Sequence, residues 1–378
     1  MRNILFGKGK AFAIAILFIG ICIIPISGSV EINKRIGVLG NERGSILYVG
    51  GSGGENYSTI QEAIDAAVNG DIVFVYDYSS PYQENIRINK QISVIGENRD
   101  TTNINGVTGQ NHVVRISSKN AEISGFTITG AAGSQDGIVV YLTVEESSIS
   151  NNIIKDSSYG ILLQATSGRI TISDNIISYN DFQGIFLQES DRNIISGNTI
   201  SDNNDFGIAI DTISTQNEIF DNIIEDNFAG IRISGGGSQN IISGNKILNN
   251  DMEGILIEGV LSTVNNLTGN NISGNNAGIK ISSGGKNIIK SNNIKDNSME
   301  GIFLSLSNEN IIEMNNFIEN RRNARYIISF RNTWDKNYWD DWIGIRFNIS
   351  LFKMFPKTIR GIILRNRDFN PQEEPYNI

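Results

Sequence analysis

The chain has 378 residues, with 39 glycines but only 5 prolines, and its formal net charge is −9. So acidic a chain is a poor partner for nucleic acid, whose phosphates need lysine and arginine to neutralise them. The sole cysteine, Cys22, lies in an N-terminal apolar run, and the sole histidine is His112. The rest of the chain therefore offers no disulfide or thiolate metal site, and we expect neither a metal nor another cofactor.

The N-terminus has the pattern of an export signal. Basic residues precede the apolar run 11–26, which is 16 residues long, and the small residues 27–29 follow it. This order is typical of a signal peptide, and an uncleaved anchor is the alternative because the run is near the short limit for spanning a bilayer. We assign residues 1–29 to this signal peptide or anchor and residues 30–45 to a linker. We expect the remainder to be secreted or displayed at the cell surface, with membrane contact only through the N-terminal segment.

The first predicted element is an amphipathic helix over residues 60–69. Thr59 and Glu62 have the spacing of a capping box, and Gly70 is placed to end the helix. Its apolar residues recur at helical spacing, namely Ile60, Ala63, Ile64 and Ala67. Because the first coil of a solenoid would expose unpaired strand edges, we expect this helix to cover that end as an N-terminal cap.

Repeats of 23 or 24 residues fill the centre of the chain. Each has a glycine before an apolar, alternating segment, and these glycines are Gly137, Gly160, Gly184, Gly207, Gly230, Gly254, Gly278 and Gly301. A fixed period of this length indicates a solenoid, and the short Ile-x-Ile segments between Asn and Gly read as strands separated by turns. We predict an all-β fold, a right-handed single-stranded parallel β-helix over residues 46–320, with the hand taken from the rule for parallel crossovers.

Asparagines recur at one turn of every repeat. Stacked coils would align them in a column that includes Asn175, Asn198, Asn222, Asn245, Asn270 and Asn292. Asparagine tolerates the left-handed backbone conformation, and stacked amides hydrogen-bond along their column, so we expect a structural ladder. The glycine before each strand permits either a positive φ or close packing.

The repeat ends near Asn320 and an aromatic segment follows. All three tryptophans of the chain, Trp334, Trp339 and Trp342, fall within nine residues. They form either a carbohydrate-binding platform or a cover for the last coil. We favour the cover because an open final coil would expose unpaired backbone groups. Residues 321–378 are therefore assigned to an aromatic C-terminal cap and tail.

The strand alternation also predicts a charged outward strip. Residues two and four positions after each glycine should share one face. The candidate glycan-binding residues on this face are Phe186, Asp211, Arg232, Glu258, Lys280 and Phe303. The strip would suit a polysaccharide as a shallow groove. The alternative, which the sequence favours, is a row of exposed ion pairs worth little each, or a strip covered by the tail.

Two groups of segments carry a family resemblance. The first comprises Tyr57-Ser-Thr-Ile-Gln-Glu, Pro81-Tyr-Gln-Glu-Asn-Ile and Ile92-Ser-Val-Ile-Gly-Glu-Asn. The second comprises the Asn-x-Ile-Ser-Gly-Asn-x-Ile repeats, Asn337-Tyr-Trp-Asp-Asp-Trp and the terminal Glu374-Pro-Tyr-Asn. Together, over residues 45–378, they resemble exported β-helix proteins of the NosD type, within the wider carbohydrate-binding and sugar-hydrolase class. That class includes polysaccharide lyases, hydrolases, epimerases and proteins with no known reaction.

The resemblance implies two activities that the residues do not match. NosD proteins are associated with copper delivery to a nitrous-oxide-reducing enzyme, but copper prefers imidazole, thiolate or thioether ligands and this chain has one histidine. The motifs of polygalacturonases, pectin esterases and alginate-type epimerases are absent, so no catalytic residue is assigned. Equivalent positions in adjacent coils would still bring two carboxylates within the 5–10 Å or so that a hydrolase needs.

Three functions follow as alternatives. The first is an exported β-helix protein that binds or organises a polysaccharide or cell-surface glycan without catalysis. The second is a polysaccharide lyase or hydrolase with an unrecognised carboxylate pair. The third is a copper-handling accessory protein of the NosD type, which the shortage of ligands disfavours.

Overall fold

The computed structural model describes residues 44–130, 136–141, 144–166, 168–342, 357–362, 366–368 and 370–378. The predicted signal peptide or anchor, and all but the end of the predicted linker, lie outside these residues. Among the residues described, no helix is both long and apolar enough to cross a membrane.

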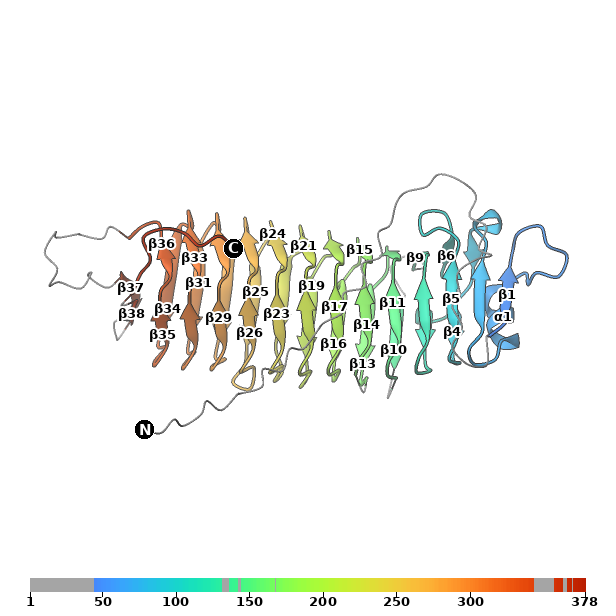
Figure 1. Ribbon diagram of the computed structural model, residues 1–378, viewed down its shortest axis with the longest axis horizontal. Helices are drawn as coiled ribbons and strands as arrows, with labels where there is room; N and C mark the ends of the chain where they lie inside the picture. Colours follow the sequence, from blue (N-terminus) through green and yellow to red (C-terminus); the bar gives the residue numbers. More distant parts are fainter. Residues whose placement is uncertain are drawn as a thin grey trace, which may run out of the picture. The chain divides into compact units, whose positions relative to one another are not determined.

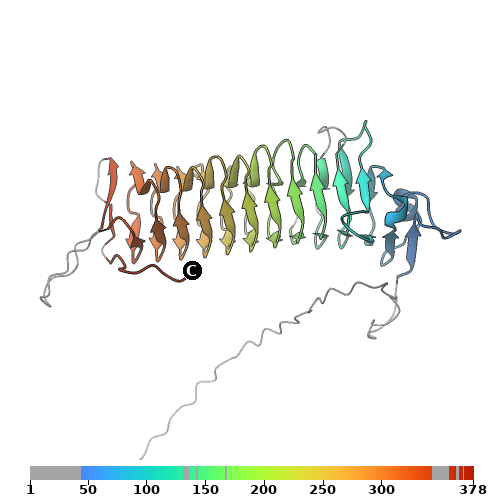
Figure 2. The same ribbon diagram turned by 90° about the horizontal axis from the view of Figure 1, so that it is seen from above.

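The described residues wind into a right-handed parallel β-helix, in which the same three strand positions recur in every coil (Figure 1, Figure 2). Each strand pairs in parallel with the strand one repeat later, as Ile138 with Ile161 and Ile161 with Ile185. The predicted fold class and the register of the glycine repeats are therefore confirmed. Three sheets, A, B and C, run along the solenoid.

Sheet A consists of short strands whose inward residues are fully buried, such as Ile172, Ile195 and Ile219. Burying an isoleucine stabilises the fold by roughly 1.5–3 kcal/mol, so one inward residue per strand accumulates into a continuous core. Its strands are β1 (Ile46–Val49), β2 (Ile72–Val75), β5 (Ser93–Gly96), β8 (Glu122–Ser124), β11 (Ser148–Ser150), β14 (Thr171–Ser173), β17 (Ile194–Ser196), β20 (Glu218–Phe220), β23 (Ile241–Ser243), β26 (Asn266–Thr268), β29 (Ile288–Lys290), β32 (Ile311–Glu313), β35 (Thr333–Asp335) and β38 (Asn366–Asp368).

Sheet B follows sheet A after one turn, and its strands bury one or two residues each, such as Ile177 and Ile200. Its strands are β3 (Tyr82–Gln83), β6 (Asn103–Asn105), β9 (Thr127–Thr129), β12 (Ile153–Lys155), β15 (Ile176–Ser178), β18 (Thr199–Ser201), β21 (Ile223–Glu225), β24 (Lys246–Leu248), β27 (Asn271–Ser273), β30 (Asn293–Lys295), β33 (Asn316–Ile318) and β36 (Tyr338–Trp339).

Most strands of sheet C are longer and bury two or more residues, such as Ile185 and Leu187. At the C-terminal end it joins sheet A, because its last strand pairs antiparallel with β38. Its strands are β4 (Ile86–Ile88), β7 (His112–Ile116), β10 (Asp136–Tyr141), β13 (Ile161–Gln164), β16 (Ile185–Gln188), β19 (Phe206–Asp211), β22 (Ala229–Ile233), β25 (Glu253–Glu258), β28 (Ala277–Ser282), β31 (Glu300–Ser305), β34 (Arg322–Ile327) and β37 (Lys357–Ile362).

Buried asparagines hydrogen-bond from coil to coil at the turn between sheets A and B. The backbone N–H and side-chain amide of Asn222 both donate to Oδ1 of Asn245, each at 3.0 Å, and the amide also donates to the carbonyl of Ile195 at 2.9 Å. The same column runs through Asn152, Asn175, Asn198, Asn222, Asn245, Asn270, Asn292, Asn315 and Asn337. Two further columns run parallel to it, through residues such as Asn203 and Asn227 or Asn217 and Asn240.

The left-handed conformation predicted for these asparagines lies one residue earlier, so that part of the prediction is wrong. Asp174, which precedes Asn175, has φ of 57°, and Asp221, which precedes Asn222, has φ of 56°. Because the chain turns at the residue before the asparagine, the asparagine side chain points into the column. Its amide there reaches the neighbouring coils. The residue with positive φ stays at the surface, and its identity varies along the column.

The repeated glycines are explained by close packing. A Cβ on Gly160 would lie 2.5 Å from the carbonyl oxygen of Gly184 and 2.5 Å from Cγ2 of Ile177, which points inward from sheet B. Gly184 and Gly207 have the same two kinds of neighbour. These glycines therefore face the core, and their missing side chains leave room for sheet B.

The α-helix α1 (Ile60–Ala66) packs against β1, β2 and β4 at the N-terminal end of the solenoid (Figure 1). Thr59 Oγ1 accepts a hydrogen bond from the Glu62 N–H at 3.2 Å, as the capping box predicts. The helix ends before the predicted residue 69. Lys90 Nζ donates to the carbonyls of Ile64, Asp65 and Ala67, at 3.0, 2.6 and 2.7 Å, and so satisfies the last carbonyls.

The predicted cap region places two of its tryptophans in the core. Trp334 is 3% exposed and Trp339 1%, and Trp339 stacks on Phe317 of the preceding coil with ring centroids 4.4 Å apart. Asp368 Oδ2 accepts hydrogen bonds from the Trp339 indole at 3.1 Å and from the Asn337 side chain at 2.9 Å. Asp368 thus takes the place of the next asparagine of the ladder.

Candidate functional site

The candidate strip lies on the outer face of sheet C, called here the sheet C face. Phe186, Arg232, Lys280 and Phe303 occupy equivalent positions on β16, β22, β28 and β31, and each is partly exposed. Asp211 and Glu258 lie at the strand ends, at the position two residues further along. The register inferred from the sequence thus agrees with the strand pairing.

Charges on this part of the face are largely paired. Arg232 Nε lies 2.8 Å from Glu258 Oε1, and Lys280 Nζ lies 2.7 Å from Glu253 Oε1. Asp211 instead accepts a hydrogen bond from the N–H of Thr212 at 2.7 Å. The alternative of ion pairs therefore describes the geometry of this central part of the strip.

The sequence analysis did not predict one row of this face, because it did not establish which way the glycines point. Since each glycine faces the core, the residue before it turns out onto the sheet C face. This row supplies Glu253 and Glu300, which pair with Lys280 and with Arg322 and Arg325. It also supplies Phe206, whose ring lies 5.3 Å from the Arg232 guanidinium carbon. The sequence signal for inward glycines was the repeated isoleucine of sheet B, such as Ile177, whose side chain fills the space beside the glycine.

An aromatic platform lies nearer the N-terminus on the same face. The ring of Tyr159 stacks on those of Phe182 and Phe186, with centroids 5.1 and 5.7 Å apart. Phe182 is 48% exposed. Burial raises the pKa of the Tyr159 phenol, which keeps it neutral and able to donate a hydrogen bond. Exposed rings with a polar edge suit sugars, whose C–H faces pack on aromatic rings.

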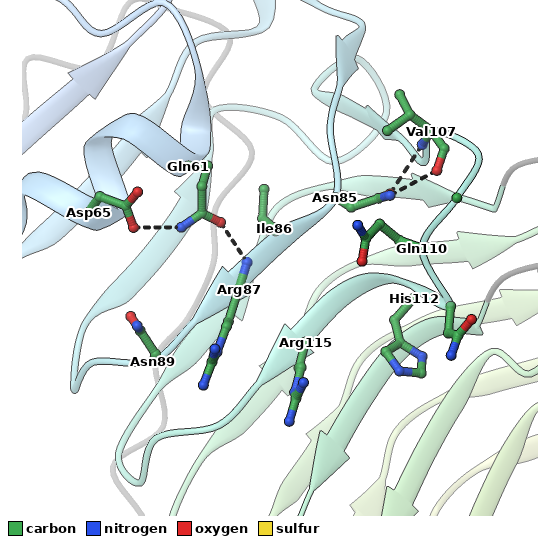
Figure 3. A pocket seen from close by; sticks show the side chains of 12 residues that line it. Gln61, Asp65, Asn85, Ile86, Arg87, Asn89, Val107, Gln110, His112 and Arg115 are labelled. Atoms are coloured by element: carbon green, nitrogen blue, oxygen red, sulfur yellow. Dashed lines mark hydrogen bonds between the residues drawn. The ribbon is translucent and has the colours of Figure 1, made fainter.

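A pocket of about 780 Å³ opens where β4 and β7 meet α1 (Figure 3). Arg87 and Arg115 are direct cross-strand neighbours on β4 and β7. In the described part of the chain neither guanidinium forms an ion pair, although Arg87 Nε donates to Ser117 Oγ at 3.2 Å. The other lining residues are Gln61, Asp65, Asn85, Ile86, Asn89, Val107, Gly109, Gln110, Asn111 and His112.

The sole histidine lies at the rim of this pocket, held between two groups. His112 Nδ1 is 3.0 Å from Asp136 Oδ2, and Nε2 is 2.9 Å from the hydroxyl of Tyr141. The carboxylate favours the tautomer with the N–H on Nδ1, so Nε2 accepts a hydrogen bond from the Tyr141 hydroxyl. Burial raises the pKa of Tyr141, Asp136 raises it further, and Arg115, 5.0 Å from the ring centroid, lowers it.

Arg87, Arg115 and His112 were not among the predicted site residues. Arg87 and Arg115 occupy the same outward column as Val139, Leu162 and Phe186, extended toward the N-terminus past the regular glycines. The irregular spacing of the first coils hid this continuation in the sequence.

The fold and this exposed face define a parallel β-helix protein. The A-modules of mannuronan C-5 epimerases AlgE4 and AlgE6 from Azotobacter vinelandii share the fold, with TM-scores of 0.63 and 0.60 at 19% and 18% identity. The matches cover 72% and 74% of this chain and 90% and 88% of those chains. The Dettilon tailspike protein gp208 matches with a TM-score of 0.57 at 18% identity, over 73% of this chain and 68% of that chain. Such identities establish the fold alone.

A comparison of the chain with models of protein families identifies its family. The model described as periplasmic copper-binding protein (NosD) matches residues 64–253 and 235–344, and the chain belongs to this family. The resemblance read from the sequence is confirmed. A comparison with curated proteins finds no match.

The described residues do not fit the copper centre that the family's description implies. Both ring nitrogens of His112 are engaged, by Asp136 and Tyr141. Met252 and Met299 are separated by a whole coil, because Asn276 hydrogen-bonds to both from between them. Within the described ranges no three His, Cys, Asp or Glu residues come together as a metal-binding group. Copper prefers imidazole, thiolate or thioether ligands, and several of these must converge on one ion.

Proposed function

We propose that this protein is an exported β-helix that binds an acidic polysaccharide along the sheet C face. The observation that carries the proposal is the pair Arg87 and Arg115 in the wall of the pocket. Like charges directly opposite each other on a sheet destabilise it, so an anion between them would stabilise the folded protein. A sugar carboxylate suits this position, because arginine forms charge-assisted, bidentate hydrogen bonds with carboxylates.

The aromatic platform supports a polymer rather than a small anion as the ligand. Phe186 lies on the third strand of sheet C after the one that carries Arg115, which is a distance of about 14 Å at the usual strand spacing. A chain anchored by its carboxylate at Arg115 would pass Tyr141 and reach Tyr159 and Phe186. Beyond them the paired charges of the predicted strip offer hydrogen-bonding groups rather than net charge.

Location outside the cytoplasm is part of the same proposal. The family is described as periplasmic, and the N-terminal residues 1–29 have the pattern of an export signal. Acidic polysaccharides of the cell envelope would be accessible to a protein there.

Binding of sodium polygalacturonate to the full-length protein, measured by isothermal titration calorimetry, tests the proposal. We expect binding that weakens with salt, no binding of neutral dextran, and a loss of at least about tenfold in affinity for Arg87→Gln with Arg115→Gln. Arg331→Gln is the matched control, because Arg331 is exposed and lies at the other end of the solenoid. Equal binding by the double variant and the parent would refute the proposal.

A second candidate function, polysaccharide lyase activity, is favoured by the contacts of His112. A lyase removes the proton α to the sugar carboxylate while the glycosidic oxygen leaves and is protonated. Arg115 would neutralise the carboxylate, and the hydrogen-bonded series Asp136, His112 and Tyr141 would carry the proton. The predicted carboxylate pair has no counterpart in the pocket lining, where Asp65 is the one acidic residue.

The same substrate separates the two functions. A lyase would release unsaturated uronate ends, seen as ultraviolet absorbance, and Tyr141→Phe would abolish the signal while polymer binding persisted. A binding protein would give calorimetric heat without any rise in absorbance.

A further inference from the structure

A second pocket lies near the N-terminal end of sheet A, between β1, β2 and the glycine-rich loop 50–56 that follows β1. Its volume is about 780 Å³. It is lined by Tyr48, Gly51, Ser52, Gly53, Asn56, Tyr76, Asp77, Tyr78 and Glu97. Three of these residues are tyrosines and two are acidic, while lysine, arginine and histidine are absent from the lining. The arginine-lined pocket beside α1 has the opposite character.

Two of the tyrosines form an aromatic wall with Phe74 on the outside of sheet A. Tyr48 and Tyr76 stack with centroids 5.8 Å apart and an angle of 18° between the rings. Phe74 meets both rings edge-on, at 6.2 and 5.2 Å. Tyr78 is 83% exposed, so most of its ring is free to contact a ligand. An exposed aromatic cluster of this kind marks a binding surface.

The glycine-rich loop fixes the shape of the pocket. Gly50 and Gly51 both have φ of 71°, and a Cβ on Gly51 would lie 2.9 Å from Cδ2 of Tyr76. The backbone therefore approaches the ring more closely than any side chain would allow. Asn56 Nδ2 donates to the Gly50 carbonyl at 2.6 Å and holds the loop in this position.

The two carboxylates have acceptor capacity to spare. Asp77 Oδ2 accepts from Thr101 Oγ1 at 2.7 Å, and Glu97 Oε2 accepts from the Asp77 N–H at 3.1 Å. Within the described residues, neither carboxylate forms an ion pair. The pocket therefore combines two negative charges with electron-rich aromatic faces.

We infer that this pocket binds an amine-bearing sugar unit. Its ammonium group would donate to Asp77 and Glu97, which gives the strong charge-assisted class of hydrogen bond. The tyrosine faces attract the same cation and pack against the C–H face of the sugar ring. This site would act independently of the sheet C face, since the two pockets share no lining residue.

Calorimetry on the full-length protein with fully deacetylated chitotetraose tests the inference. We expect the N-acetylated tetramer, which lacks the ammonium, to bind at least about tenfold more weakly. Asp77→Asn with Glu97→Gln should weaken the deacetylated tetramer by a similar factor, and Tyr78→Ala should weaken it also. Glu55→Gln is the matched control, because Glu55 is exposed in the same loop but does not line the pocket.

Three results would overturn the inference: no binding of the deacetylated tetramer, equal binding of both tetramers, or a loss in Glu55→Gln as large as in the double variant. The last would mean non-specific attraction to an acidic surface. Arg87→Gln with Arg115→Gln should leave this binding unchanged, which separates the result from that for the acidic polysaccharide. Unchanged thermal melting of the variants verifies that they are folded.

Discussion

Individual residues of the repeat are constrained by what lies one coil away, and the asparagine ladder illustrates this best. Asn222 is 0% exposed. Its backbone N–H and side-chain amide donate hydrogen bonds, and its Oδ1 accepts one from the Asn198 N–H. Leucine has a similar size but can make none of the side-chain bonds. A buried polar group left without its partner destabilises the fold, so the ladder is predicted to be sensitive to this change.

Asn222→Leu is expected to lower the free energy of unfolding by roughly 1–3 kcal/mol for each buried group that it leaves unpaired. Those groups include the Asn198 N–H and the Ile195 carbonyl. Urea denaturation of the variant and the parent measures the difference. Asn204→Leu is the control, because Asn204 is exposed. If Asn222→Leu unfolds at the same urea concentration as the parent, the ladder does not stabilise the fold.

The inward glycines give a second prediction at this scale. Gly160→Ala would place a Cβ 2.5 Å from a backbone carbonyl oxygen and from Ile177 Cγ2, so overpacking should cost about 1–3 kcal/mol. Gly54→Ala is its match, because nothing lies within 4 Å of the Cβ position there. Thermal melting should separate the two variants clearly. Equal melting temperatures would show that the core expands to accept the methyl group.

The residue scale also shows how far sequence reasoning reaches. The period identified Asn222 and Gly160 as repeated positions, because equivalent residues must do the same task in every coil. It did not reveal that Gly160 faces inward or that Asp221 takes the positive φ, because both depend on how sheet B packs against sheet C. A single strand's alternation contains no information about that opposing sheet.

Elements are shaped by partners distant in the chain, as α1 demonstrates. The capping box predicted where the helix begins, because Thr59 and Glu62 act locally. Its end depends on Lys90, which no local pattern could indicate. Its N-terminus has a further distant partner, since Glu84 accepts from the N–H groups of Ile60 and Gln61 at 2.8 and 3.0 Å.

Glu84 makes the stability of the folded protein depend on pH at this helix. Burial raises the pKa of Glu84 above its ordinary value of 4.5, although the two backbone hydrogen bonds oppose the shift. The folded state thus binds this proton more tightly than the unfolded state. The contribution of Glu84 to stability is therefore fully present below pH 4.5 and is lost as the pH rises through the raised pKa.

Glu84→Gln removes this one titration. The difference in unfolding free energy between the parent and Glu84→Gln should therefore shift in favour of the parent as the pH falls toward 4.5. Urea denaturation at several pH values measures the difference, in which the other carboxylates cancel. Glu55→Gln is the control, because Glu55 is exposed. A difference that is constant with pH would contradict the assigned shift.

At the scale of the whole molecule, the solenoid has two ends that need different solutions. The first coil is packed against α1, and the last strands meet an aromatic layer and a returning tail. The tail is tied back by reciprocal hydrogen bonds of 2.8 Å between the Asn316 side chain and the Tyr376 backbone. The sequence predicted the first end from the amphipathic helix and the second from the loss of the repeat, whereas the neighbouring arginines of the proposed binding face became visible only when the coils were stacked.

Removing residues 321–378 should therefore make the solenoid aggregate. A chain that ends at Asn320 would leave β31, β32 and β33 with unpaired edges and expose Phe317, now covered by Trp339. Open edges recruit strands from other molecules. The measurement is soluble yield and size-exclusion chromatography of the truncated and full chains. Asp368→Leu gives a milder comparison, because it leaves the strand edges covered and removes the acceptor of the Asn337 and Trp339 hydrogen bonds, so it should lower the melting temperature without aggregation. A truncated chain that stays monomeric and melts cooperatively would show instead that residues 321–378 are an appended module, and the loss of glycan binding alone would then identify their function.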